Sequence, residues 1–168
     1  MLSQPKIAAL IVAAGRGTRA GGSTPKQWQP LCGKRVIDHT IAAFQDHPSV
    51  DRLIVVLNEA DMAHAQELTD KGCIIATGGV DRAASVRNGL AALGDADQVL
   101  IHDAARPCVS AEVIDHVIAA LQSGPAAAPG IAVTDALWVA ENGTVAGIQD
   151  RTALYAAQTP QGFDVAAI

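Results

Sequence analysis

Apolar residues along the chain fall into two alternating patterns. Continuous runs of strand length occur at Ile7–Ala14, 52–57, 73–77 and 98–102. Segments with apolar residues at helical spacing follow at 36–47, 59–71, 83–93 and 111–121, with Ser110 as a plausible N-cap for the last. Continuous apolar strands are typical of parallel sheets covered on both faces. The pattern therefore predicts an α/β fold, a parallel sheet with helices on both faces.

The alternation of strand and helix patterns ends after residue 121. Residues 122–130 read as a loop, and 131–133 as a fifth strand. Residues 136–148 read as two short strands around Asn142–Gly143, and an Asn-Gly dipeptide between alternating residues is the strongest local signal for a β-hairpin. Such a hairpin is either an edge decoration of the sheet or an arm that reaches a partner.

Composition narrows the class of protein. With 168 residues, 49% of them hydrophobic and 17% charged, the chain has the size and composition of one globular domain, which we expect to span 1–168. A formal net charge of -5 argues against non-specific nucleic-acid binding. The three cysteines are odd in number, widely spaced and without a C-x-x-C pair, so they predict neither a disulfide framework nor a zinc site.

The apolar run near the N-terminus is about nine residues long, which is too short for a membrane span. It ends in a glycine-rich loop, which is unlike the end of a signal peptide. We therefore expect a cytoplasmic protein that does not associate with membranes.

Ligands of doubly wound sheets bind beyond the carboxyl ends of the strands. Three loops in that position are rich in glycine or polar residues, namely Gly15–Lys26, Gly78–Arg82 and Asp103–Pro107. Their shared position predicts one binding site that all three loops build.

The first loop allows three interpretations. Gly15-x-Gly17-x-x-Ala20 matches a dinucleotide fingerprint, but the glycines, Ser, Thr and Pro that follow are poor helix formers, and no acidic residue ends the second strand. The spacing from Gly17 to Gly22 matches a P-loop, but Ser23 stands where the lysine is required. In the third interpretation, an open loop wraps a nucleoside triphosphate, with backbone N–H groups and the cations Arg19 and Lys26 on its phosphates.

Several motifs together carry a family resemblance. AAGRGTR with PKQ, GGVDRAASVRNGL at 78–90, HDAARP at 102–107 and DR…AAQTPQGF at 150–163 occur in this order over almost the whole chain. The sequence resembles the 2-C-methyl-D-erythritol 4-phosphate cytidylyltransferase family. The resemblance implies a Rossmann-like, mostly parallel α/β fold of the nucleotide-diphospho-sugar transferase type, with a protruding β-hairpin arm at about 134–150.

The resemblance also implies a reaction and a set of site residues. The family joins the phosphate of methylerythritol phosphate to the α-phosphate of CTP with Mg²⁺ or another divalent cation, and releases diphosphate for isoprenoid biosynthesis. By position, the catalytic residues are Arg19, Lys26 and Arg151, and the CTP-binding residues are Ala13, Ala14, Gly15, Gly17, Gly79 and Ser85. Substrate-binding residues are Asp103, Arg106 and Thr159, with Asp103 also near the metal.

Two further properties follow from the resemblance. The arm clasps a second subunit, so that Arg151 reaches the partner's active site in a homodimer. The family continues for about one more supersecondary unit with a substrate-orienting lysine, so we expect this chain to be C-terminally short. Two alternatives stay open, a cytidylyltransferase for another polyol phosphate such as ribitol 5-phosphate, and a truncated, catalytically deficient CTP-binding module.

The residues themselves suit this chemistry. A phosphate nucleophile is already anionic at neutral pH, so catalysis needs positioning and charge neutralisation and no general base. His102, on an apolar strand, is expected to be a core histidine with satisfied hydrogen bonds, and not a catalyst.

Overall fold

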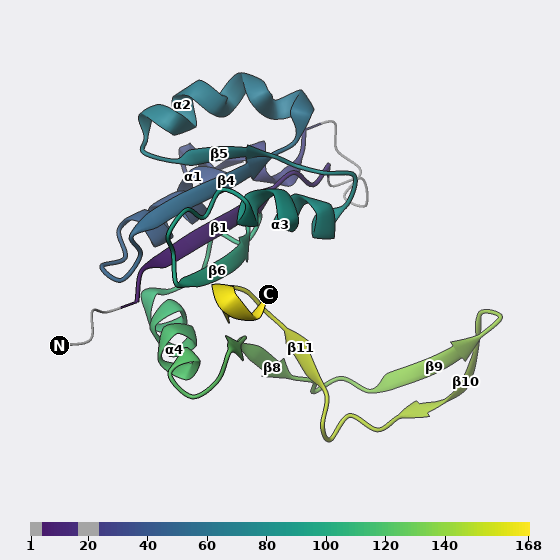
Figure 1. Cartoon of the computed structure of the whole chain (residues 1–168). Coiled ribbons are helices and arrows are strands. Elements are labelled where there is room, and N and C mark those ends of the chain that lie inside the picture. The colour runs from purple at the N-terminus through teal and green to yellow at the C-terminus, as the bar shows by residue number, and fades with distance from the viewer. Residues whose placement is uncertain (1–4, 17–23) are drawn as a thin grey trace.

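A six-stranded sheet forms the centre of the molecule in the computed structural model, which describes residues 5–16 and 24–168 (Figure 1). The strand order is β5-β4-β1-β6-β12-β7. The bounds are β1 Ile7–Ala13, β4 Arg52–Leu57, β5 Ile74–Thr77, β6 Gln98–Asp103, β7 Ala126–Ala127 and β12 Gln161–Asp164. Strands β5, β4, β1 and β6 run parallel, and β12 runs antiparallel to its two neighbours. The predicted α/β fold with a mostly parallel sheet is confirmed.

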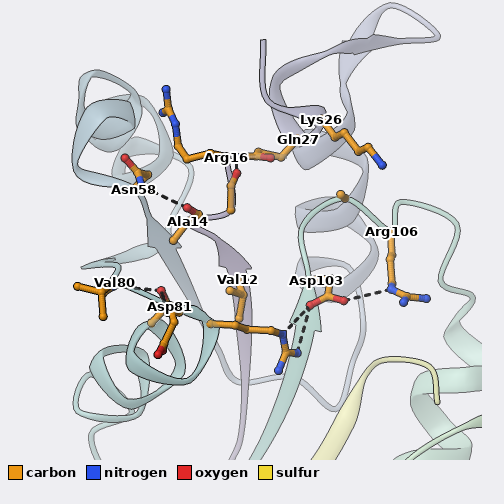
Figure 2. Close-up of a pocket in the computed structure, with 15 residues that line it drawn as sticks. Val12, Ala14, Arg16, Lys26, Gln27, Asn58, Val80, Asp81, Asp103 and Arg106 are labelled. Atoms are coloured by element: carbon orange, nitrogen blue, oxygen red, sulfur yellow. Dashed lines mark hydrogen bonds and ion pairs between the residues drawn. The ribbon is translucent and has the colours of Figure 1, made fainter. Parts of the chain in front are cut away.

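The carboxyl ends of β1 and β6 lie side by side, and Arg16 and Arg106 each follow three residues beyond the end of a strand (Figure 2). From β1 the chain proceeds outward to β4 and β5, and it then returns to the other side of β1 as β6. This reversal is the topological switch point at which open α/β sheets bind ligands.

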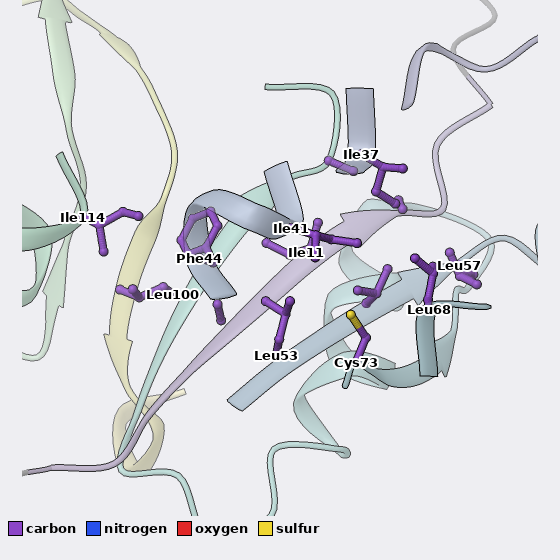
Figure 3. Close-up of a cluster of buried hydrophobic side chains, with 14 of the residues drawn as sticks. Ile11, Ile37, Ile41, Phe44, Leu53, Leu57, Leu68, Cys73, Leu100 and Ile114 are labelled. Atoms are coloured by element: carbon purple, nitrogen blue, oxygen red, sulfur yellow. The ribbon is translucent and has the colours of Figure 1, made fainter. Parts of the chain in front are cut away.

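Helices cover the two faces of the sheet, as predicted. They are α1 Val36–Gln45, α2 Ala65–Asp70, α3 Arg82–Leu90 and α4 Ala111–Leu121, with short 3₁₀ helices η2 Lys26–Trp28, η3 Glu59–His64 and η4 Val165–Ala167. On one face, side chains of α1, α2 and α4 form one apolar cluster with Ile7, Ala9 and Ile11 of β1 (Figure 3). On the other face, Val86 and Leu90 of α3 pack with Ala8 and Leu10. Alternate β1 side chains therefore enter opposite cores.

Local sequence explains where two of these helices begin and how one of them packs. The Ser110 hydroxyl accepts a hydrogen bond from the Val113 N–H, which confirms Ser110 as an N-cap. Asp81 caps α3 in the same way through the Ala84 N–H. Gly89 lies inside α3, although glycine lowers helix propensity, because a Cβ there would lie 2.6 Å from Leu10 Cδ1. The missing side chain lets α3 approach the sheet.

Two predictions about secondary structure need correction. The strand predicted at 131–133 is present as β8 (Gly130–Ala132), but it is exposed and pairs with β11 (Tyr155–Ala157) in a separate small sheet, so it does not extend the main sheet. The strand that continues the sheet beyond β6 is the antiparallel β12. Residues 59–71 do not form one helix, since η3 precedes α2.

Two hairpins complete the fold. Strands β2 (Pro30–Leu31) and β3 (Lys34–Arg35) pair across Cys32 and Gly33, both of which have positive φ. Strands β9 (Leu137–Glu141) and β10 (Thr144–Gln149) form the predicted hairpin, with positive φ at Asn142 and Gly143. This second hairpin, hereafter the arm, projects away from the sheet (Figure 1).

Candidate active site

A cavity of about 800 Å³ opens at the carboxyl ends of β1, β4 and β6 and at the start of α3 (Figure 2). The loops that were predicted to build one site all contribute to its wall. The lining residues are Val12, Ala14, Gly15, Arg16, Lys26, Gln27, Asn58, Gly79, Val80, Asp81, Arg82, Ser85, Asp103, Ala105 and Arg106.

Gln27 connects the two described ends of the first loop. Its side chain is buried, and its amide Nε2 donates to the Ala13 carbonyl at 2.8 Å and to the Gly15 carbonyl at 3.0 Å. Asn58, after β4, donates to the Ala14 carbonyl at 3.2 Å. These side-chain bonds hold the carbonyl groups of three consecutive residues, Ala13 to Gly15, where the chain leaves the sheet.

An ion-pair network holds the segment that carries Lys26 and Gln27. The Arg35 guanidinium contacts Asp38 at 2.8 Å and Glu67 at 2.5 Å, and it lies over the Trp28 ring of η2. The Arg35 guanidinium, together with Lys71, holds the pKa of the Asp38 carboxyl well below its usual range, although partial burial opposes the shift. Lys26, on the same segment, is exposed at the rim of the cavity.

The second loop is ordered by its own hydrogen bonds. The buried Ser85 hydroxyl accepts from the Gly79 N–H at 3.0 Å and donates to the Asp81 carbonyl at 2.8 Å. A Cβ on Gly79 would lie 2.4 Å from the Ala84 Cβ, so only glycine allows this close turn onto α3. The turn places Val80, Asp81 and Arg82 on the cavity wall.

Asp103, the last residue of β6, is shared between two arginines. Arg82 donates to its Oδ1 at 3.2 Å, and Arg106 donates to its Oδ2 at 3.1 Å (Figure 2). Arg106 also donates to the Gln158 side chain at 2.6 Å, which joins this wall to the segment before β12. This part of the cavity wall therefore holds two guanidinium groups with the Asp103 carboxylate between them.

The buried histidine behind this wall has both ring nitrogens in hydrogen bonds. His102 Nε2 lies 3.0 Å from the Arg106 carbonyl, and Nδ1 lies 2.9 Å from the Thr159 hydroxyl. Burial lowers the pKa of His102 below its ordinary value of 6.5. As expected, this is a core histidine with satisfied hydrogen bonds.

The structure brings together most of the residues proposed from the sequence. Seven of them line the cavity, namely Ala14, Gly15, Lys26, Gly79, Ser85, Asp103 and Arg106. Ala13 lies just behind, buried, with its carbonyl on Gln27. Thr159 sits next to Gln158 and bonds to His102. Gly17 and Arg19 lie outside the described residues.

Arg151 does not line the cavity of its own chain. It follows the arm, is exposed, and donates to the Thr134 carbonyl at the start of the arm. The family resemblance already implied that Arg151 does not act in the cavity of its own chain.

Sequence reasoning did not assign Arg16, Asn58, Asp81 or Arg82, which all line the cavity. A signal for three of them was present, because Arg16 lies in the first of the three predicted loops, and Asp81 and Arg82 lie in the second. Asn58 directly follows β4, and the same rule about carboxyl ends of strands would have found it.

The donor set near Asp103 suits a magnesium ion held with the help of a substrate. Among the residues that the structure describes, no three His, Cys, Asp or Glu side chains gather to hold a metal. Mg²⁺ is commonly held by only one or two carboxylates together with substrate phosphates and waters. The partly exposed Asp103 carboxylate, beside a cavity with room for a substrate and its phosphates, meets that requirement.

Fold and cavity together define an α/β protein of the nucleotidyltransferase type. Two solved structures titled 4-diphosphocytidyl-2C-methyl-D-erythritol synthase resemble it. One is 34% identical with a TM-score of 0.81, and covers 97% of this chain and 76% of its own. The other, from Anaerococcus prevotii DSM 20548, is 27% identical with a TM-score of 0.82, and covers 97% and 71%.

Sequence comparison gives the family. The model of the 2-C-methyl-D-erythritol 4-phosphate cytidylyltransferase family matches residues 7–168. A protein of that name from Roseobacter denitrificans is 53% identical over 97% of this chain and 74% of its own length. A "Bifunctional enzyme IspD/IspF" from Ruegeria pomeroyi is 55% identical over 96% of this chain and 43% of its own. The chain belongs to the 2-C-methyl-D-erythritol 4-phosphate cytidylyltransferase family.

Proposed function

We propose that the cavity is the active site in which this chain transfers CMP from CTP to 2-C-methyl-D-erythritol 4-phosphate. As a member of its family the chain is an enzyme, a cytidylyltransferase of the methylerythritol phosphate pathway of isoprenoid biosynthesis. One observation carries the placement of the site. The loops after β1, β4 and β6, together with the start of α3, converge on one cavity whose wall presents Lys26, Arg82 and Arg106.

CTP lies along the first and second loops in this proposal. The backbone of Ala13, Ala14 and Gly15, held by Gln27 and Asn58, faces the nucleotide, and Gly17 and Arg19 continue the same loop. Gly79 and Ser85 read the cytosine. The fixed turn between Gly79 and Ser85 supports this role, because rigid hydrogen-bonding groups discriminate between bases better than mobile ones.

The chemical step needs no general base. A phosphate oxygen of methylerythritol phosphate attacks the α-phosphorus of CTP, a new P–O bond forms, and the bond to the β-phosphate oxygen breaks. Diphosphate leaves with the electron pair, and the product is 4-diphosphocytidyl-2-C-methyl-D-erythritol. Lys26 and Arg19 neutralise the negative charge that concentrates around the α-phosphorus, as fixed cations do in phosphoryl transfer.

The polyol phosphate binds on the β6 side of the cavity. Asp103 and Arg106 line that side, and Thr159 lies next to Gln158, which Arg106 contacts. Asp103 would also hold Mg²⁺, which, when bound, neutralises phosphate charge. Arg82 and Arg106 keep the carboxylate in place until substrate arrives.

A homodimer explains both the arm and Arg151. Trp138 and Ile148 face each other across the two strands of the arm, and they are 68% and 79% exposed. A two-stranded ribbon is marginal by itself in water, and exposed apolar patches commonly mark interfaces. We infer that the arm packs on a second copy of this chain, where Arg151 completes the other active site.

We further infer one nucleotidyltransferase domain over 1–168 and a cytoplasmic location. None of the described helices has the length and apolar character needed to cross a membrane. Cys32, Cys73 and Cys108 are free thiols, as is usual in a reducing compartment. Cell fractionation would test the location.

The direct test is turnover by the purified chain with CTP and a panel of polyol phosphates, followed as diphosphate release and as cytidine-diphosphate product. We expect methylerythritol phosphate to be preferred and activity to disappear when a chelator removes divalent ions. Preference for ribitol 5-phosphate would contradict the proposed substrate. CTP binding without diphosphate release would support the catalytically deficient module instead.

Shared active sites are tested by mixing two inactive variants. If Arg151 acts in the partner's site, hybrids of an Arg19→Ala subunit and an Arg151→Ala subunit contain one intact site and recover activity. Each variant alone is the control. A verified hybrid without recovery, or a monomer in light scattering, would contradict the shared site.

A further inference from the structure

His102 links two segments that the proposed function places on the polyol phosphate. It is the penultimate residue of β6, has no exposed surface, and packs against the Phe44 ring at 4.9 Å between centroids. One ring nitrogen holds the turn that carries Arg106, and the other holds Thr159, 57 residues further along the chain. Both contacts go to residues assigned to the same substrate.

The two contacts fix which nitrogen carries the hydrogen. The Arg106 carbonyl oxygen can only accept, so the Nε2 at 3.0 Å must be the donor. The ring is fully buried, and its two hydrogen-bond partners among the described residues, a carbonyl and a hydroxyl, are uncharged, so the imidazole stays neutral. A neutral ring has one N–H only, so Nδ1 is an acceptor.

This tautomer determines the direction of the hydrogen bond at Thr159. The Thr159 hydroxyl lies 2.9 Å from Nδ1 and must donate its single hydrogen to it. Only the lone pairs of the hydroxyl oxygen are then left for a ligand. Ionised phosphate oxygens also only accept, whereas a polyol hydroxyl can donate.

We infer that His102 is a positioning residue that turns the Thr159 hydroxyl into an obligate hydrogen-bond acceptor for a hydroxyl group of the polyol. The inference rests on the proposed function, because it takes Thr159 as a substrate contact. The inference gives different parts of the substrate to different residues on this side of the cavity. Thr159 selects a hydroxyl, while the cationic groups, Arg106 among them, serve the phosphate.

Two substitutions of His102 each remove one of its two hydrogen bonds and keep the other. In His102→Asn, the side-chain oxygen can take the place of Nδ1 and accept from Thr159, while the bond to the Arg106 carbonyl is lost. In His102→Gln, the longer amide can donate to that carbonyl, while the acceptor for Thr159 is lost. A purely structural role predicts similar damage from both.

The kinetic test compares the two substrates in each variant. We expect His102→Gln to raise KM for the polyol phosphate about fivefold or more, in keeping with the loss of one hydrogen bond, and to leave KM for CTP unchanged. Thr159→Val should behave alike, and the double variant should be no worse than either single one. His102→Asn should raise KM for the polyol phosphate less than His102→Gln does, because it keeps an acceptor for the Thr159 hydroxyl.

Deoxy analogues test the acceptor directly. The unaltered chain should bind one mono-deoxy polyol phosphate more weakly than the parent compound, whereas His102→Gln should bind the two equally. Equal discrimination by both proteins would overturn the inference, as would a parallel rise of KM for CTP in His102→Gln.

A spectroscopic measurement separates this inference from the proposed function. In the ¹⁵N NMR spectrum of the unaltered chain, we expect a protonated Nε2 and an unprotonated Nδ1 for His102. The opposite tautomer, or a doubly protonated ring at neutral pH, would overturn the inference whatever the activity. Absence of turnover with methylerythritol phosphate, with the expected tautomer present, would instead count against the proposed function.

Discussion

The Gln27 side chain offers the sharpest test of how the first loop is built. Its amide makes two hydrogen bonds, at 2.8 Å and 3.0 Å, to carbonyl groups of Ala13 and Gly15, and the side chain is only 4% exposed. Gln27→Met keeps a side chain of similar length and removes both donors. The substitution therefore removes the hydrogen bonds with little change in packing volume.

The size of the effect follows from those two bonds. A buried hydrogen bond contributes about 0.5–1.5 kcal/mol net, so the loss of two predicts about 1–3 kcal/mol in the free energy of unfolding. Since the proposal places CTP on this backbone, part of the loss should appear in binding. Each 1.4 kcal/mol so expressed raises KM for CTP about tenfold.

Gln29 provides the matched control two residues away. Its side chain is exposed and donates to the Thr24 carbonyl at 3.2 Å, outside the cavity wall. Urea unfolding gives the free energy, and initial rates at varied CTP give KM. If Gln27→Met and Gln29→Met behave alike in both measurements, Gln27 does not hold the nucleotide loop.

Three further predictions concern charge, acid stability and packing. Lys26→Ala should lower kcat about 100- to 1000-fold with little change in KM for CTP, because the new negative charge arises in the transition state. Because Arg35 lowers the pKa of Asp38 from its ordinary 3.8, the unfolded chain takes up the proton first as the pH falls. This contribution to stability is present above pH 3.8 and lost below it, so Asp38→Asn should flatten the acid limb of a plot of unfolding free energy against pH. Gly89→Ala should cost about 1–3 kcal/mol through overpacking, since its Cβ would lie 2.6 Å from Leu10 Cδ1, as urea unfolding can measure.

Each of these predictions has a control in the same chain. Lys34→Ala removes an exposed lysine of β3 outside the cavity wall, and should leave kcat unchanged. Asp70→Asn removes an exposed carboxylate that accepts a hydrogen bond from the neutral Gln66 side chain, and should leave the acid limb unchanged. Gly124→Ala adds a methyl group with nothing described within 4 Å, and should be tolerated. Equal effects in variant and control would contradict the corresponding prediction.

The central strands and helices could be predicted because their signals are local. A strand such as β1 is apolar at almost every position, and α4 has a hydroxyl cap and an apolar stripe within its own sequence. The arm could be predicted for the same reason, because its turn is specified by the neighbouring residues Asn142 and Gly143, which both adopt positive φ. The short strands β7 and β12 were missed, because a strand of two to four residues is specified by its pairing partner and not by its own pattern.

The candidate site also has a part that the sequence predicted and a part that it did not. The three loops could be found from the sequence, because the carboxyl ends of parallel strands lie at one edge of a sheet. The contacts within the site join residues that are distant in the chain, such as Arg82 with Asp103, 21 residues apart. No periodicity carries such a pairing, so these partners could not be predicted from the residues alone.

The sequence by itself thus determined the α/β pattern, the apolar faces of its helices, the turn of the arm and the loops that carry the chemistry, because each depends on neighbouring residues. Only the tertiary structure decided that β12 pairs with β6 and that Gln27 holds the carbonyl groups at the start of the first loop. It also decided the acceptor role inferred for Thr159. That role depends on a buried ring from another strand, whose hydrogen is fixed by a third segment.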